Sequence, residues 1–222
     1  MSAGRDNHRW LRLWKAKDIA FHQLEVNRFL KMFWARALEP KEHRVFVPLC
    51  GKSRDMIWLA QQGHQVVGVE LSTLAAEAFF RESGLVARKT RVGAFVQFKS
   101  KQISILCGDY FLLTKEVLGA VDSVYDCTAL SALSEAVRPQ YVAQLKKVLA
   151  PATNILLLTI EDTLRSSGRP FPAPIEPEVA ALYGPQSDIR LTHHEWMEPG
   201  DKLCSEDQTM QSAYYVYEIE LR

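Results

Sequence analysis

The amino-acid sequence predicts an α/β fold, with a mostly parallel sheet that is covered by helices on both faces. Short apolar runs alternate with stretches of helical periodicity, and several of the apolar runs end at a Gly or an acidic residue. Strands buried on both faces read as continuous apolar runs, as these do. At 222 residues we expect one domain over 1–222, with an N-terminal helical segment over 1–44 and an α/β body over 45–222.

Composition and charge exclude several classes of protein. A hydrophobic content of 47% with a net charge of +1 is not typical of a disordered chain. No run approaches the roughly 18 apolar residues of a membrane span, and the charged start does not resemble a secretory signal. The balanced charge gives no argument for a nucleic-acid or membrane partner. We therefore expect a cytoplasmic protein that acts on a small molecule.

Two amphipathic helices are predicted ahead of the body. Trp10, Leu13 and Trp14 recur at helical spacing, and a second helical pattern covers 26–38. The first 44 residues hold ten Lys/Arg against five Asp/Glu. We interpret this basic excess as a solvated helix face, which leaves the body slightly acidic.

The first part of the body has the pattern of two strand–helix units. The predicted strands cover 44–51 and 65–71, and the predicted helices cover 52–62 and 72–83. Gly63 and Gly84 stand where each helix stops, as glycines at helix C-termini commonly do. Ser72 can accept a backbone N–H and is a plausible N-cap of the second helix.

The second part continues the alternation and contains one long loop. The pattern predicts a short helix or hairpin within 85–101, strands over 102–109, 121–126 and 154–162, helices over 134–149 and 178–184, and terminal strands over 189–196 and 213–221. Pro139 falls near the start of its helix, where proline is tolerated. Residues 164–177 contain four prolines and follow the end of a strand, so this loop is a candidate lid.

The cysteines and histidines predict no metal site. Cys50, Cys107, Cys127 and Cys204 lie far apart, so we expect free thiols in a reducing compartment. The six histidines show no metal-ligand spacing.

Three predicted strand ends carry residues that suit a nucleoside. In a doubly wound sheet, ligands bind beyond the carboxyl ends of the strands. Gly51 would let the backbone lie close to a ligand, Glu70 could accept hydrogen bonds from both ribose hydroxyls, and Asp109 could hold an adenine amino group. A phosphate loop or dinucleotide fingerprint needs more glycines than this stretch has. The combination favours S-adenosylmethionine over NAD or ATP.

Several motifs together resemble the thiopurine S-methyltransferase family. They are Trp10-x3-Trp14, Ala20-Phe21-His22-Gln23, the long run from Val47-Pro48-Leu49-Cys50-Gly51-Lys52-Ser53 to Val69-Glu70-Leu71-Ser72, and Asp122-x-x-Tyr125-Asp126. The resemblance covers about residues 8 to 221. It implies a class I methyltransferase fold, which has a seven-stranded sheet with an antiparallel last strand and an N-terminal helical lid. It also implies S-adenosylmethionine as the methyl donor and a small thiol or selenol as the acceptor, methylated by direct in-line displacement.

The resemblance assigns a role to individual residues. Cofactor contacts fall on Trp10 and Trp14 of the lid, Leu49 and Gly51 of the first loop, Glu70 at the ribose, Asp109 and Tyr110 at the adenine, and Cys127 after the fourth strand. Phe21 would contact the substrate, with His22 beside it. A thiol whose pKa lies near the operating pH needs little base catalysis, and His22 and Asp162 are the candidates where a base is used.

The family pattern is broken at one informative position. Cys127 stands where relatives have an arginine, and a second arginine, whose loose match is near Ser205, is also absent. A thiol cannot replace a guanidinium as a partner for carboxylates. Cys127 is either a small filler or part of a pocket for a neutral or smaller thiol, so we expect acidic aromatic thiols to be poor substrates.

Two other functions stay open at this stage. One is a methyltransferase of divergent acceptor specificity, in natural-product biosynthesis or in tellurite or selenite detoxification. The other is a non-catalytic relative that has kept cofactor binding. We expect a monomer in each case.

Overall fold

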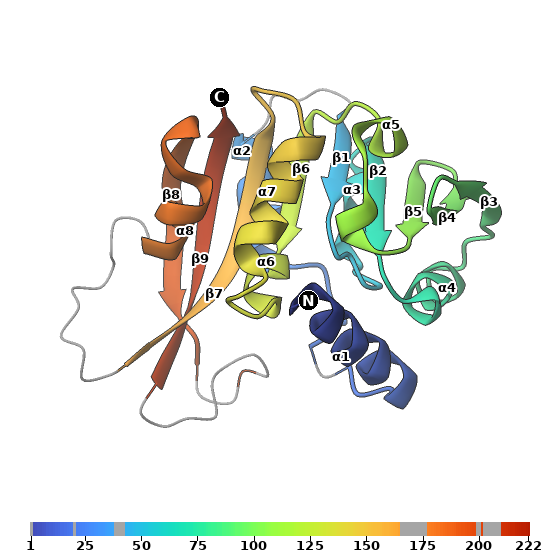
Figure 1. Ribbon diagram of the computed structural model, residues 1–222, viewed down its shortest axis with the longest axis horizontal. Coiled ribbons are helices and arrows are strands. Elements are labelled where there is room, and N and C mark those ends of the chain that lie inside the picture. Colours follow the sequence, from blue (N-terminus) through green and yellow to red (C-terminus); the bar gives the residue numbers. More distant parts are fainter. Residues whose placement is uncertain (1, 20, 38–42, 165–176, 199–200, 202–209) are drawn as a thin grey trace.

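The computed structural model describes residues 2–19, 21–37, 43–164, 177–198, 201 and 210–222 (Figure 1). Its strands are β1 (Arg44–Val47), β2 (Gln65–Glu70), β3 (Arg88–Val92), β4 (Phe95–Ser100), β5 (Ile103–Cys107), β6 (Ser123–Cys127), β7 (Asn154–Leu164), β8 (Ser187–Trp196) and β9 (Met210–Leu221). Its helices are α1 (Ser2–Ala16), α2 (Arg28–Ala37), α3 (Asp55–Gln61), α4 (Thr73–Glu82), α5 (Lys115–Leu118), α6 (Ala129–Ala132), α7 (Arg138–Val148) and α8 (Pro177–Tyr183), with 3-10 turns η1 (Tyr110–Leu112) and η2 (Gly184–Gln186).

All of these strands join one sheet in the order β3-β4-β5-β2-β1-β6-β7-β9-β8. Strands β5, β2, β1, β6 and β7 are parallel, and β9 runs antiparallel between β7 and β8. The α/β prediction and the antiparallel last strand are therefore confirmed. The predicted count of seven is short by two, because β3 and β4 form a hairpin that pairs antiparallel with β5. The sequence left a short helix or a hairpin open within 85–101, and the structure shows the hairpin.

Helices cover both faces of the sheet, and the side chains of β1 alternate between them. Phe46 packs with α7 and α8, which lie toward the viewer in Figure 1. Val45 and Val47 point to the opposite face, where α2, α3 and α4 close a second core. This two-sided burial explains why the strand reads as an uninterrupted apolar run.

The predicted helix signals hold where the structure describes them. The Ser72 hydroxyl accepts the backbone N–H of Ala75 at 3.3 Å and caps α4. Gly63 and Gly84 follow α3 and α4 with φ of +94° and +64°, which glycine adopts at low cost. Pro139 lies in the first turn of α7, a helix that begins at Arg138 rather than at the predicted 134.

Two predictions fall outside the described residues. The candidate Pro-rich lid is one, since its residues 165–176 are not described. The assignments of Cys204 as a free thiol and of Ser205 as the loose match of an arginine are the other. Within the described ranges, no helix has the length and apolar character needed to cross a membrane.

Candidate functional site

A cavity of about 110 Å³ lies at the carboxyl ends of β1 and β6. Strand β1 is the point at which the strand order reverses, between β2 on one side and β6 on the other, and ligands of doubly wound sheets bind at this position. Helix α1 lies across the same end of the central strands (Figure 1). The cavity is lined by Trp14, Phe21, His22, Gln23, Val47, Pro48, Leu49, Cys50, Gly51, Lys52, Ser53, Asp55, Cys127 and Thr128.

The backbone that borders the cavity is strained at two positions. Leu49 and Thr128 have φ of 47° and 58°, in the left-handed region that residues with a side chain rarely adopt. Gly51 has a φ of 53°, which glycine adopts at low cost. A Cβ at Gly51 would lie 3.4 Å from the indole of Trp14, so the backbone there meets an aromatic face directly. Such strain concentrates at ligand sites, where it shapes a close backbone surface.

Glu70, at the end of β2, lies beneath this loop. One carboxylate oxygen, Oε2, accepts the N–H of Gly51 at 2.9 Å, and Oε1 accepts the N–H of Ser72 at 2.6 Å. Burial raises the pKa of Glu70 to about 7, against the lowering effect of these backbone donors. The backbone N–H of Leu71 is a third donor to this carboxylate. A carboxylate has about four acceptor positions, so about one remains for a ligand.

Helix α1 is held over the strand ends by two acidic groups. The Asn7 amide donates to Oδ2 of Asp109 at 2.8 Å, beyond the end of β5. Oδ2 of Asp6 accepts the N–H of Ser134 at 3.0 Å and its hydroxyl at 2.9 Å, in the segment between α6 and α7. The helix is thus attached on both sides of the cavity.

An aromatic cluster closes one side of the cavity. The ring of Phe21 meets Trp10 and Trp14 edge to face, with centroid separations of 5.1 and 5.6 Å. Burial and the nearby Lys52 lower the pKa of His22, which favours its neutral form. Lys52 itself is paired with Glu82 at 2.7 Å.

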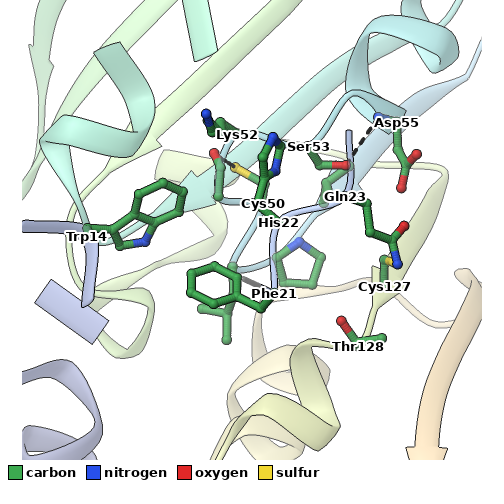
Figure 2. A pocket seen from close by; sticks show the side chains of 14 residues that line it. Trp14, Phe21, His22, Gln23, Cys50, Lys52, Ser53, Asp55, Cys127 and Thr128 are labelled. Carbon is green, nitrogen blue, oxygen red and sulfur yellow. Dashed lines mark hydrogen bonds between the residues drawn. The ribbon is translucent and has the colours of Figure 1, made fainter. Parts of the chain in front are cut away.

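A polar cluster forms the opposite side, where Figure 2 shows Gln23, Asp55 and Cys127 away from Trp14. The backbone N–H of Asn27 donates to Oδ1 of Asp55 at 2.8 Å. Its side-chain amide contacts Oε1 of Gln23 at 3.1 Å and Sγ of Cys127 at 3.8 Å. Asn27 therefore holds the three lining side chains together.

The sequence prediction missed this polar cluster. Asp55 and Gln23 lie inside the motifs quoted for the family, but neither received a role. An acid two residues after the Gly51-Lys52-Ser53 turn, at the start of a helix, was the available signal.

Most of the predicted site residues converge on the cavity. Trp14, Phe21, His22, Leu49, Gly51 and Cys127 line it. Three other predicted residues lie just behind the cavity wall. Trp10 contacts Phe21, and Glu70 accepts the N–H of Gly51, both of which line the cavity. Asp109 accepts a hydrogen bond from Asn7 of α1.

The structure places two predicted residues elsewhere. The ring of Tyr110 is buried in the core and its hydroxyl donates to the carbonyl of Tyr141 at 3.1 Å, so the predicted adenine contact of this residue would fall to its backbone. Asp109 caps η1 and directs the following ring inward. Asp162 does not line the cavity, since β7 continues to Leu164 and the carboxylate accepts the Ser212 hydroxyl at 2.5 Å.

Comparison with known proteins decides the family. The sequence model of the thiopurine S-methyltransferase family matches residues 5–217. The chain belongs to this family. The thiopurine S-methyltransferase of Stutzerimonas stutzeri is 49% identical over 86% of this chain and 81% of its own length. That of Methylococcus capsulatus is 46% identical over 82% of each chain. The protein is thus an S-adenosylmethionine-dependent methyltransferase.

Solved structures agree with this assignment at the level of the fold. The methyltransferase superposes on the 1,6-didemethyltoxoflavin-N1-methyltransferase of Burkholderia thailandensis, a structure with bound S-adenosylhomocysteine, with a TM-score of 0.58. The two share 12% identity, and the match covers 97% of this chain and 87% of that one. A protein described for the conversion of a disulfide into a thioacetal in echinomycin biosynthesis gives a TM-score of 0.59 at 14% identity, over 88% and 82% of the two chains.

Proposed function

We propose that this methyltransferase transfers the methyl group of S-adenosylmethionine to the sulfur of a small, uncharged thiol. Family membership supports the reaction class. The observation that carries the choice of acceptor is the polar side of the cavity, where Cys127 stands at the position that the family resemblance gives to an arginine, beside the carboxylate of Asp55. An anionic acceptor would meet a buried acid there and find no guanidinium to pair with.

The described residues fit the cofactor. Gly51 has no Cβ, so another group can approach its backbone closely, as the indole of Trp14 does. Glu70 keeps about one acceptor position for a ribose hydroxyl, and Asp109 can exchange the Asn7 amide for an adenine amino group. The cofactor supplies a methyl group already activated by the sulfonium.

The chain contributes alignment and a dry environment. Trp10, Trp14 and Phe21 offer aromatic surface to a cation and exclude water from the reacting sulfur. Helix α1 acts as the lid, held by its contacts to Asp109 and Ser134. Holding thiol and methyl donor in line converts a bimolecular encounter into a unimolecular step, which removes several kcal/mol of the barrier.

A matched pair of acceptors tests the proposal. Thiophenol and 4-mercaptobenzoate share the ring and the thiol and differ in a carboxylate. With S-adenosylmethionine, we expect kcat/KM to be at least about tenfold higher for thiophenol, equivalent to about 1.4 kcal/mol of charge discrimination. Equal rates, or faster methylation of the acid, would contradict the uncharged acceptor.

Two further outcomes bear on the reaction itself. S-adenosylhomocysteine binding without turnover of any thiol, selenol or inorganic selenite or tellurite would show a non-catalytic relative. Turnover of selenite or tellurite in preference to every thiol would show the divergent acceptor class.

A further inference from the structure

Asp55 is a buried acid on the wall of the reaction cavity. It begins α3, its residue is 2% exposed, and it lines the cavity beside Gln23 and Cys127 (Figure 2). Burying a carboxylate is costly unless a cation pairs with it. Among the described residues, no Lys, Arg or His side chain lies within salt-bridge distance of Asp55. Packing alone therefore does not account for the acid.

Three neutral donors fix the carboxylate without exhausting it. Oδ1 accepts the N–H of Asn27 at 2.8 Å, and Oδ2 accepts the hydroxyl of Tyr125 at 2.9 Å. The Ser53 side chain is a third hydrogen-bond partner. A carboxylate has about four acceptor positions, so about one position remains. Because Asp55 lines the cavity, the partner that remains is a group inside it.

Several neighbouring groups lower the pKa of Asp55. Hydrogen bonds from the backbone of Asn27 and from the side chains of Tyr125 and Ser53 lower it, and Lys31 on α2 lowers it by attraction. On β6, Tyr125 and Cys127 both stay protonated, since burial raises the pKa of each. His22 and Lys52 face the same cavity.

Burial outweighs these lowering effects. Desolvation is the largest influence on Asp55, and its pKa is raised above the usual range of an aspartate. A carboxylate that holds its proton more tightly than usual is a stronger base.

We propose that Asp55 accepts the proton of the acceptor thiol during methyl transfer. This inference rests on the proposed function. The S–H bond breaks as its proton moves to a carboxylate oxygen of Asp55. The sulfur electron pair forms the bond to the methyl carbon, and the electron pair of the breaking C–S bond stays on the leaving sulfur. The sulfur atoms of the thioether product and of S-adenosylhomocysteine are both uncharged. Asp55 then loses its proton to water.

The chemistry of the acceptor gives this step a purpose. A typical thiol has a pKa near 8.5 and is mostly protonated at neutral pH, whereas the thiolate is the nucleophile. A fixed base therefore matters for ordinary thiols and is unnecessary for thiols that are already ionised. This dependence on the acceptor separates a base from a structural acid.

The test compares the wild type with Asp55→Asn on two thiols that carry no other ionisable group. 2-Mercaptoethanol is protonated at neutral pH, and pentafluorothiophenol is ionised there. We expect the variant to lose roughly 100-fold in kcat with 2-mercaptoethanol, the lower range for general-base catalysis. With pentafluorothiophenol we expect a loss of less than about threefold, since no proton has to be removed. Equal losses on both thiols would overturn the proposal and leave the proposed function intact.

Two controls exclude a merely structural effect. Asparagine keeps the size of Asp55 and an oxygen for the Asn27 N–H, so Asp55→Asn should bind S-adenosylhomocysteine with an unchanged Kd in calorimetry. A Kd weakened by tenfold or more would instead assign Asp55 to cofactor binding and reject the base. Wild-type protein that methylates neither thiol would refute the proposed function and this inference together.

Tyr125→Phe provides a second, conservative variant. It removes the donor to Oδ2 and so raises the pKa of Asp55 further. The acidic limb of the kcat/KM profile for 2-mercaptoethanol should move to higher pH, while the plateau rate changes little. An acidic limb that stays in place would contradict the role of Asp55.

Discussion

The backbone N–H of Gly51 donates to Oε2 of Glu70 across 2.9 Å, so the loop after β1 and the end of β2 share one buried carboxylate. The same carboxylate accepts the N–H of Ser72 at the start of α4. A single titratable group therefore ties together the two strand ends at which the cofactor is proposed to bind. Its protonation state influences both cofactor affinity and stability.

Cofactor affinity should depend on pH through Glu70. Burial raises the pKa of Glu70 to about 7, so at pH 6 the carboxylate is mostly protonated and a poor acceptor for ribose hydroxyls. We expect S-adenosylhomocysteine to bind about tenfold more tightly at pH 8 than at pH 6, in proportion to the ionised fraction. Calorimetry at both pH values measures this. Glutamine at position 70 does not titrate, so the Kd of Glu70→Gln should change less between pH 6 and pH 8 than that of the wild type. A wild-type Kd that does not vary with pH would exclude the ribose role.

Stability should change in the opposite direction with pH. A folded-state pKa of about 7, above the unfolded value of 4.5, means that the folded chain holds more protons between these values. The stabilisation that protonated Glu70 contributes to the folded state is complete below pH 4.5 and is lost as the pH rises through 7. Between pH 6 and pH 8, the free energy of unfolding should fall by about 1 kcal/mol more in the wild type than in Glu70→Gln. Urea titrations of both proteins check the sign, and a parallel pH dependence in the two would contradict the raised pKa.

Gly51 and Gly84 are a matched pair that tests whether the cofactor lies close to the backbone at Gly51. Both have positive φ, +53° and +64°, but a Cβ at Gly84 meets nothing within 4 Å, whereas one at Gly51 meets Trp14. Alanine at either position should cost about 1 to 2 kcal/mol of stability through the left-handed backbone. Only Gly51→Ala should weaken S-adenosylhomocysteine binding, by about tenfold, or about 1.4 kcal/mol. Equal affinities of the two variants would show that the cofactor does not approach Gly51.

The contact of Asn7 with Asp109 should control how tightly α1 is held. Asn7→Ala removes one hydrogen bond to a carboxylate, with a net effect of about 1 kcal/mol. Amide hydrogen exchange in α1 should then be about fivefold faster. His8→Ala is the control, because His8 is exposed on the same helix. Similar acceleration in both variants would indicate a general loss of helicity.

Cys127 should be dispensable as a nucleophile. Burial raises the pKa of its thiol, and its Sγ accepts a weak contact from Asn27 at 3.8 Å. Cys127→Ala should keep kcat/KM for thiophenol within about threefold, as expected for the loss of a weak sulfur acceptor. A loss of several hundredfold would point to covalent participation of the thiol.

The strand ends were predictable from the sequence, because Gly51, Glu70 and Asp109 each follow an apolar run at a fixed place in the alternation. The polar side of the cavity was not. Asp55 depends on Tyr125, which is 70 residues away in the sequence, and no local pattern shows that contact. The orientation of the Tyr110 ring was not predictable for a related reason, since it packs against Tyr141, which is distant in the sequence.

The β3–β4 hairpin also determines which strand forms one border of the sheet. Every residue of β5 is buried, so an uncovered β5 would offer apolar side chains and unpaired backbone groups to another chain, which is the usual start of aggregation. The hairpin covers this strand and leaves β3 outermost. The exposed side chains of β3 are Arg88, Lys89 and Arg91. A row of cations repels a second copy of itself, so the two added strands protect this border against intermolecular strand pairing.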